Sequence, residues 1–238
     1  MKRILYLLPC FLLLQVQAQE QEPFLSIDDL PNMTNVLPPP PDILSPGFAY
    51  DIMEYMWGKE QRHDSVRLAI AVRDAVWNVE TMCHEFSEPF GMVLSEENTP
   101  ELYKLLVMVA ANTELVGRKP KAHYMRKRPY VRFNEPTIAP WDEEGLRNNG
   151  SYPSGHTILG WSTALVLTEI NPERQDTILA RGYMYGESRV IAGFHWRSDV
   201  NAGFLSASAA VARLHAEPRF MAQVEKARQE FRRKKGLK

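Results

Sequence analysis

Two residues that could form a catalytic pair, His195 and Asp199, lie in the stretch ESRVIAGFHWRSDV. On a helix, residues four apart share one face, so the carboxylate could accept from one imidazole nitrogen while the other nitrogen points into a cleft. This is the arrangement of an activated nucleophile. Arg189, six residues before the histidine, could reach the same cleft. A surface His–Asp pair beside a surface arginine is the alternative that the segment alone leaves open.

The stretch GSYPSGHT has the residue types of an anion-binding helix start. Ser154 can cap the helix that follows, and Gly155 lets the backbone approach a ligand closely. Free backbone N–H groups and the helix dipole would attract an anion, and the anion would favour the protonated form of His156 in the first turn. An ordinary capped helix start with an incidental histidine would show the same residues.

The stretch KAHYMRKRPY places two cations where they could bind a multiply charged oxyanion. Lys121 and Arg128 are seven residues apart, or two helical turns, so on a helix they would project from one face. Arginine offers a planar fork of donors and lysine a point charge. Pro129 disfavours helical geometry at the residue before it. A basic face in contact with solvent is the competing interpretation.

The elements that position these segments are predicted to be helices. From Tyr50 onward, apolar residues recur at helical spacing, and no strand-like alternation with hairpin turns competes with it. A continuous helical segment is predicted over residues 64–90, with Val66 on its apolar face, and another starts at Pro100 with Thr99 as its N-cap. We expect an all-α fold, a single-domain helical bundle of six to eight helices.

The N-terminus, residues 1–18, has the pattern of a secretory signal peptide. Lys2 and Arg3 precede an apolar run, and small residues predict cleavage after Ala18. The apolar run over residues 4–14 is short for a membrane anchor, which is the alternative. No later stretch approaches a spanning length, so stable membrane insertion after cleavage is not expected.

The rest of the chain divides into an arm and a domain. Residues 19–48 are polar and proline-rich, and the four prolines at 38–41 predict an arm that runs extended over the surface. Residues 49–238 are assigned to the helical catalytic domain. Loss of the signal peptide leaves 26 basic and 29 acidic residues, which gives no reason to expect nucleic acid as a partner. Only Cys83 survives cleavage, as a thiol predicted to be buried.

In chain order the three segments read Lys-x6-Arg-Pro, Pro-Ser-Gly-His and Ser-Arg-x5-His-x3-Asp. This order resembles the signature of the type-2 phosphatidic acid phosphatase and vanadium haloperoxidase superfamily, and all eleven specified positions are filled. Within that superfamily, GSYPSGHT and the upstream LPPPP region look like the bacterial class A non-specific acid phosphatases. The resemblance extends from Leu37 to the C-terminal helix.

The resemblance implies a periplasmic, all-helical homo-oligomer that hydrolyses small-molecule phosphate monoesters without a metal or other cofactor. His195 would be the nucleophile that becomes a phosphohistidine, Asp199 would fix its tautomer, and His156 would be the general acid and then the base. The phosphoryl oxygens would be held by Lys121, Arg128, Ser154, Arg189 and the backbone N–H of Gly155. An acidic pH optimum is expected, because His156 must be protonated while His195 stays neutral.

Three other functions stay open on the sequence alone. A lipid phosphatase of the superfamily would use the same residues, although those enzymes are usually polytopic membrane proteins. A vanadate-dependent haloperoxidase would bind vanadate in the phosphate site, although those chains are usually much longer. A non-enzymatic anion-binding module would have no use for the pair of His195 and Asp199. The motifs contact only the phosphoryl group, so they do not identify the leaving group.

Overall fold

The computed structural model describes residues 22–237, so the predicted signal peptide, residues 1–18, lies outside the described residues. No strand occurs in the part described, and the expected all-α fold is confirmed. The helices outnumber the six to eight expected because several are short. In chain order they are α1 (Pro46–Glu60), α2 (Ser65–Arg73), α3 (Val79–Phe90), α4 (Pro100–Thr113), α5 (Arg118–Tyr124), α6 (Pro129–Phe133), α7 (Glu143–Leu146), α8 (Gly155–Ile170), α9 (Gln175–Ile191), α10 (Arg197–Leu214) and α11 (Pro218–Lys235).

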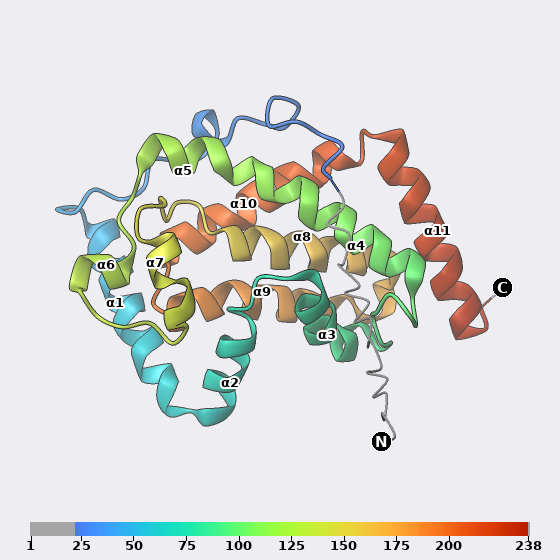
Figure 1. Cartoon of the computed structure of the whole chain (residues 1–238), viewed down its shortest axis with the longest axis horizontal. Helices are drawn as coiled ribbons and strands as arrows, with labels where there is room; N and C mark the ends of the chain where they lie inside the picture. The colour runs from blue at the N-terminus through green and yellow to red at the C-terminus, as the bar shows by residue number, and fades with distance from the viewer. Residues whose placement is uncertain (1–21, 238) are drawn as a thin grey trace, which may run out of the picture.

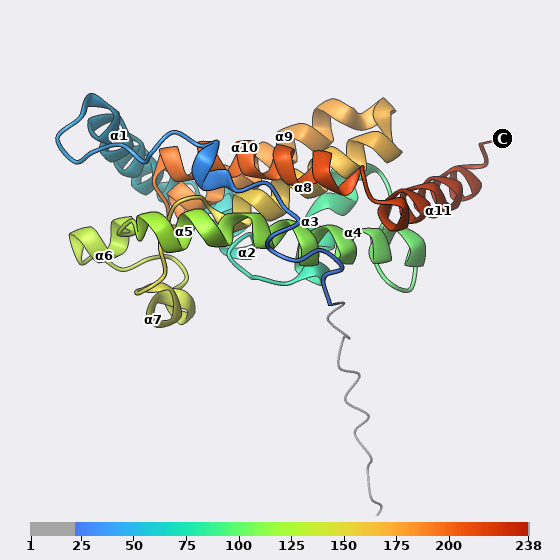
Figure 2. The same cartoon turned by 90° about the horizontal axis from the view of Figure 1, so that it is seen from above.

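Helices α8, α9 and α10 form the centre of the molecule, with α4 packed on α8 and α10 and α11 packed on α4 (Figures 1 and 2). Eleven of the sixteen residues of α8 are buried, as expected for a helix that is apolar on all sides. Figure 1 shows that α8 and α10 begin, and α9 ends, at the same end of the bundle, close to α5, α6 and α7. The three sequence segments with candidate chemistry therefore meet at this end.

Glycines allow the central helices to approach closely. A Cβ atom on Gly182 of α9 would lie 2.5 Å from Cβ of Ala164 on α8, and one on Gly203 of α10 would lie 2.7 Å from Cβ of Thr157 on α8. Both distances are too short for two carbon atoms, so a side chain at either position would push the helices apart. The second contact lies in the first turn of α8, at the last residue of the GSYPSGHT segment.

The prediction of one continuous helix over residues 64–90 is wrong. The chain forms α2 and α3 with a turn at residues 74–78 between them, and Val66 is exposed rather than part of a buried face. Asp74 in this turn is fully buried and forms an ion pair with Arg181 of α9. A partner more than one hundred residues away thus stabilises a break that local periodicity does not show.

Helix α4 begins at Pro100 as predicted, but Thr99 does not cap it with its side chain. The Thr99 hydroxyl instead accepts from the backbone N–H of Ser95 at 3.1 Å. The N–H groups of Glu101 and Leu102 donate to a carboxylate oxygen of Glu230 on α11, at 3.1 and 3.0 Å. A side chain from another helix therefore satisfies the orphan donors at this helix start.

The described part of the N-terminal arm, from residue 22, is more deeply packed than an extended surface segment would be. It contains a short 3₁₀ turn, Met33–Asn35, and buries four apolar side chains in the main core, namely Leu25, Leu30, Met33 and Leu37. The side-chain oxygen of Asn112 on α4 accepts from the N–H groups of residues 24 and 25 at 3.0 and 2.9 Å. Within residues 22–237, none of the helices is both long enough and apolar enough to cross a membrane.

Candidate active site

A cavity of about 750 Å³ opens where α5, the α7–α8 loop and the start of α8 meet. Five of the predicted site residues line it, namely Lys121, Arg128, Gly155, His156 and His195. The other three, Ser154, Arg189 and Asp199, are fully buried beside it. The fold thus brings together residues from α5 to α10 that are up to 78 positions apart in the chain.

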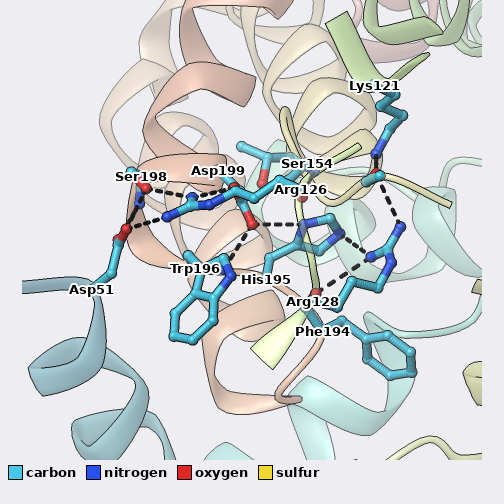
Figure 3. A network of polar contacts seen from close by, with 12 residues as sticks. Asp51, Lys121, Arg126, Arg128, Ser154, Phe194, His195, Trp196, Ser198 and Asp199 are labelled. Atoms are coloured by element: carbon cyan, nitrogen blue, oxygen red, sulfur yellow. Dashed lines mark hydrogen bonds and ion pairs between the residues drawn. The ribbon is translucent and has the colours of Figure 1, made fainter. Parts of the chain in front are cut away.

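The contacts of its two ring nitrogens define the tautomer of His195. Its Nε2 atom lies 3.0 Å from Nη1 of Arg128, and a guanidinium can only donate, so Nε2 is the acceptor. The ring proton is therefore on Nδ1, which lies 3.5 Å from Oδ2 of Asp199 (Figure 3). This leaves a lone pair on Nε2, the nitrogen that faces Arg128, as a nucleophile requires.

The predicted pairing of His195 with Asp199 is found, but its expected basis on one helix face is wrong. The histidine lies just outside α10, whose N-cap is Trp196. Asp199 is in the first turn of that helix, and its Oδ2 atom accepts from the backbone N–H of Trp196 at 2.9 Å. The carboxylate thus reaches the histidine because it folds back to cap its own helix.

The surroundings of His195 favour its neutral form. Burial lowers its pKa well below 6.5, and the positive charges of Arg128, Lys121 and Arg189 lower it further. A neutral imidazole with its proton on the side of the carboxylate agrees with the hydrogen bond that Arg128 donates to Nε2.

His156 lies in the first turn of α8, as predicted, and its ring is oriented by the turn between α2 and α3. The Nε2 atom of His156 lies 3.2 Å from the carbonyl oxygen of Ala75, so this nitrogen carries a hydrogen and Nδ1 is the one that titrates. The ring also meets that of Trp77 edge to face, with centroids 4.7 Å apart. Burial lowers the pKa of His156 well below 6.5, and the positive charges of Arg189 and Arg128 add to the effect. A negative charge close to the ring would raise this pKa again.

Three cations surround the two histidines, although not by the predicted geometry. Lys121 and Arg128 do not share a helix, because α5 ends at Tyr124 and Met125 has a left-handed backbone with φ of 42°. They converge nonetheless. Lys121 Nζ donates to the carbonyl oxygen of Gly150 at 3.0 Å, and Nη2 of Arg128 reaches the same oxygen at 3.5 Å. The extended backbone of Arg128, before Pro129, is as predicted.

Of these three cations, Arg189 is the one whose side-chain donors form no hydrogen bond with the described residues. Its guanidinium is fully buried, and its Nε, Nη1 and Nη2 atoms have no hydrogen-bond partner among the described residues. The guanidinium stacks over the ring of Phe194 at 4.8 Å. Buried donors are nearly always satisfied in folded proteins, so three unsatisfied donors on one cation point to an anion that is bound in the working state.

Burial makes the charged form of all three cations less stable, because it removes them from water. It lowers the pKa of Lys121 to about 7, with a further contribution from Arg128. It also lowers the pKa values of Arg128 and Arg189 to about 10. A multiply charged anion would relieve the mutual repulsion of these groups, so the site is electrostatically prepared for one.

Ser154 ties the beginnings of two helices together. Its hydroxyl caps α8 as predicted, accepting from the backbone N–H of Thr157 at 3.3 Å. Its own backbone N–H donates to the carbonyl oxygen of Asp199 at 3.0 Å. Gly155, next in the chain, lines the cavity, and only the ring of Trp77 lies within 4 Å of where a Cβ atom would be. The backbone at the start of α8 is therefore open to a ligand.

The chain is similar in sequence to known proteins over most of its length. A family model described as PAP2 superfamily matches residues 101–220, a range that contains all eight predicted site residues. The chain is 46% identical to the non-specific acid phosphatase of Providencia stuartii over 82% of this chain and 79% of that protein. It is 38% identical to the non-specific acid phosphatase of Salmonella typhimurium over 98% of this chain and 94% of that one. The acid phosphatase of Zymomonas mobilis is 40% identical over 82% and 74% of the two chains.

The chain belongs to the PAP2 superfamily, among its non-specific acid phosphatases. The expected family is thus confirmed. Within the described part of this PAP2 chain, there is no cluster of three or more histidine, cysteine, aspartate or glutamate side chains that could hold a metal ion. A second cavity of about 550 Å³ adjoins the PAP2 site, because Trp77, Glu114 and Arg118 line both.

Sequence reasoning missed several residues of this PAP2 site. Ala75 and Trp77, which contact His156, lie in the turn that interrupts the predicted long helix. Arg126 was also missed, although it lies between Lys121 and Arg128 in the same basic stretch. The pattern of the stretch contains no signal that separates Arg126 from the cations lining the cavity.

Proposed function

We propose that the protein hydrolyses phosphate monoesters in two steps through a phosphohistidine at Nε2 of His195. The observation that carries this proposal is the placement of an acceptor nitrogen among three buried cations. One of them, Arg189, lacks any hydrogen-bond partner within residues 22–237. A phosphoryl group has the charge to neutralise these cations and the electrophilic phosphorus that a neutral imidazole can attack.

In the first step, the Nε2 lone pair attacks phosphorus in line with the ester oxygen. A nitrogen–phosphorus bond forms, the bond from phosphorus to the ester oxygen breaks, and the leaving alkoxide takes a proton from Nδ1 of His156. Arg128 must transfer its hydrogen bond from Nε2 to a phosphoryl oxygen as the substrate enters. The Asp199 carboxylate stabilises the positive charge that develops on the His195 ring.

In the second step, water replaces the histidine on phosphorus. His156, now neutral, takes a proton from the water as the oxygen attacks. The nitrogen–phosphorus bond breaks, inorganic phosphate is released, and His195 returns to its neutral form. His156 is left protonated for the next cycle, so protons balance over the two steps.

The charge of the transferred group is balanced by side chains in this mechanism. Lys121, Arg128 and Arg189 supply cationic donors at the oxygens of the phosphoryl group, and the N–H groups at the start of α8 add neutral ones. We therefore propose that turnover needs no metal ion. Activity that is unchanged in the presence of EDTA would agree with this, and activity lost to EDTA and restored by a divalent ion would refute it.

We also propose that residues 1–18 direct export and that the mature enzyme works in the periplasm. The support is the charged, apolar and small-residue order of the N-terminal sequence. Expression of the full gene, followed by cell fractionation and N-terminal sequencing, tests this. The mature protein is expected to begin at Gln19.

Trapping the covalent intermediate tests the nucleophile. Wild-type enzyme quenched during turnover of a radiolabelled phosphate ester should carry acid-labile, alkali-stable phosphate on a histidine, and His195→Ala should carry none. His84→Ala is the matched control, because His84 is an exposed histidine on α3. Labelled phosphate retained by His195→Ala would remove His195 as the nucleophile.

The role of His156 as general acid is tested by varying the leaving group. His156→Ala should lose about 10²- to 10⁴-fold in kcat/KM on alkyl phosphates, whose leaving alkoxides need a proton. The loss on p-nitrophenyl phosphate should be much smaller, because p-nitrophenolate leaves without protonation. Equal losses on both substrates would show that His156 does not protonate the leaving group.

A further inference from the structure

Behind the His195–Asp199 pair lies a buried ion-pair network that links two carboxylates through one guanidinium (Figure 3). Arg126, in the segment between α5 and α6, donates from Nη1 to Oδ1 of Asp199 at 2.6 Å. It donates from Nη2 to Oδ2 of Asp51 on α1 at 2.7 Å. Both carboxylates are fully buried, and the Arg126 side chain is 9% exposed. The guanidinium of Arg126 thus links three segments that are distant in the chain: α1, the segment between α5 and α6, and α10.

Ser198 closes this network and ties it to the start of α10. Its backbone N–H donates to Oδ1 of Asp51 at 2.8 Å, and its hydroxyl donates to Oδ2 of the same residue at 2.6 Å. The same hydroxyl accepts from Nη1 of Arg126 at 2.7 Å. Asp51 therefore has both oxygens occupied, and it does not contact the cavity.

The bonds of Asp199 show what the network does. Its Oδ1 atom is held by Arg126, and its Oδ2 atom is held by the backbone N–H of Trp196. Two fixed oxygens prevent the carboxylate from rotating, so Oδ2 stays beside Nδ1 of His195. A single bond at Oδ2 would leave the plane of the carboxylate free to turn.

The charges of the network add a second effect. An isolated Arg126 would cancel the negative charge of Asp199, which stabilises the positive ring of a phosphorylated His195. Asp51 supplies the compensating negative charge, so that the three groups together keep a net charge of −1.

We infer that Arg126 and Asp51 are positioning residues for the reaction: they hold the Asp199 carboxylate against His195 and preserve its negative charge. The inference rests on the proposed role of His195 as nucleophile. Neither residue lines the cavity, so both act through Asp199, and their loss should change chemistry at His195 more than it changes the binding of phosphate.

The charged environment of His195 makes a directional test possible. The titratable groups that face it from the packed elements are Lys121 and Arg128 from the α5–α6 region, His156 from α8, Arg189 from α9 and Asp199 from α10. Arg126 and Asp51 lie behind Asp199. A change of one charge there alters how readily the ring is protonated, and protonation of His195 sets the acid limb of kcat/KM.

Two variants should move that limb in opposite directions. Asp51→Asn removes a negative charge, so the protonated ring is less favoured and the acid limb should move to lower pH by about one unit. Arg126→Met removes a positive charge, so the limb should move to higher pH by about the same amount. Both should lower kcat by about tenfold or more. The inhibition constant of inorganic phosphate should change by less than about threefold.

A matched control is offered by a neighbouring ion pair that also joins α1 to α10. Arg197 donates from Nε to Oε2 of Glu54 at 2.7 Å, and the Arg197 side chain is 7% exposed. Glu54→Gln weakens this link without touching Asp199, so its acid limb should coincide with that of the wild type. The same ester is used throughout, so that the ionisation of the substrate cancels.

A variant that keeps the charge provides a second test in case Asp51→Asn or Arg126→Met fails to fold. Arg126→Lys keeps the positive charge but cannot bridge two carboxylates as a planar fork does. It should leave the acid limb in place and still lower kcat several-fold. Wild-type kcat in Arg126→Lys would overturn the positioning role.

The remaining outcomes separate this inference from the proposed function. Shifts in the same direction, or no shift, in Asp51→Asn and Arg126→Met would show that the network is only structural. In that case wild-type enzyme would still yield a trapped phosphohistidine. Absence of any phosphohistidine in the wild type would refute the proposed function itself, and the positioning role with it.

Discussion

Replacing Arg189 by methionine should make the ligand-free protein more stable while destroying its affinity for phosphate. Burial, together with the charge of Arg128, lowers the pKa of Arg189 from its ordinary value to about 10. Near pH 6 the guanidinium is charged in both the folded and the unfolded chain. A fall of that size in its pKa therefore means that folding with the charge in place costs about 3 kcal/mol. The cost fades only as the pH rises above about 10, where the folded guanidinium begins to lose its proton.

Methionine has a similar length and no charge, so the Arg189→Met variant avoids this cost. Allowing for altered contacts with the ring of Phe194, we expect a gain of about 1 to 3 kcal/mol in the free energy of unfolding. Added phosphate should make the wild type as stable as Arg189→Met or more stable. At about 100 times its dissociation constant it stabilises the wild type by about 2.7 kcal/mol, and the variant gains little. The kcat/KM of the variant should fall by about 10²- to 10³-fold.

The assay is urea unfolding near pH 6, followed by tryptophan fluorescence, with and without inorganic phosphate. Arg197→Met is the control, because Arg197 is also buried but forms ion pairs with Glu54 and Glu187. Its loss leaves carboxylates uncompensated and should destabilise the protein by about 3 to 5 kcal/mol. If Arg189→Met were less stable than the wild type without phosphate, and still gained stability from phosphate, the unpaired cation would not be the anion site.

Further predictions concern pH and packing. Binding of sulfate, whose charge is constant over this range, should weaken as pH rises above about 7, because the neutral amine of Lys121 no longer attracts it; inhibition constants measured across this range check this. Gly182→Ala should lower the free energy of unfolding by about 1 to 3 kcal/mol, since its methyl group would lie 2.5 Å from a carbon of α8. Gly145→Ala, which meets nothing within 4 Å, is the control in urea unfolding. Burial lowers the pKa of His215, but hydrogen bonds to Val211 and Glu169 outweigh it and the pKa lies above 6.5. The stability that His215→Gln removes should therefore be fully present below pH 6.5 and fade as pH rises through the raised pKa, measured by unfolding at several pH values.

Several features of the fold and site were predictable because they depend on residues within one turn of each other. Ser154 caps α8 through the N–H of a residue three positions on, and Pro129 imposes an extended backbone on Arg128 by direct steric contact. The start of α4 at Pro100 follows from the same kind of local chemistry. Such effects need no partner from elsewhere in the chain.

Predictions failed where a distant residue decided the local structure. The helix predicted over residues 64–90 breaks at Asp74, whose buried carboxylate pairs with Arg181. The helix expected to carry both Lys121 and Arg128 ends at Tyr124, and the chain turns left-handed at Met125. In both cases the periodicity of the sequence was helical, and tertiary contacts outweighed a preference worth less than about 1 kcal/mol per residue.

The sequence by itself determined the residue types of the site, the order of its three segments and the capped start of α8. Only the tertiary structure decided that Arg189 is buried without a partner, that the proton of His195 is on Nδ1 and that Arg126 joins Asp51 to Asp199. The physical reason is the range of the forces involved. Capping and helix formation act between neighbours in the chain, whereas desolvation and Coulomb interactions depend on which distant residues share one buried space.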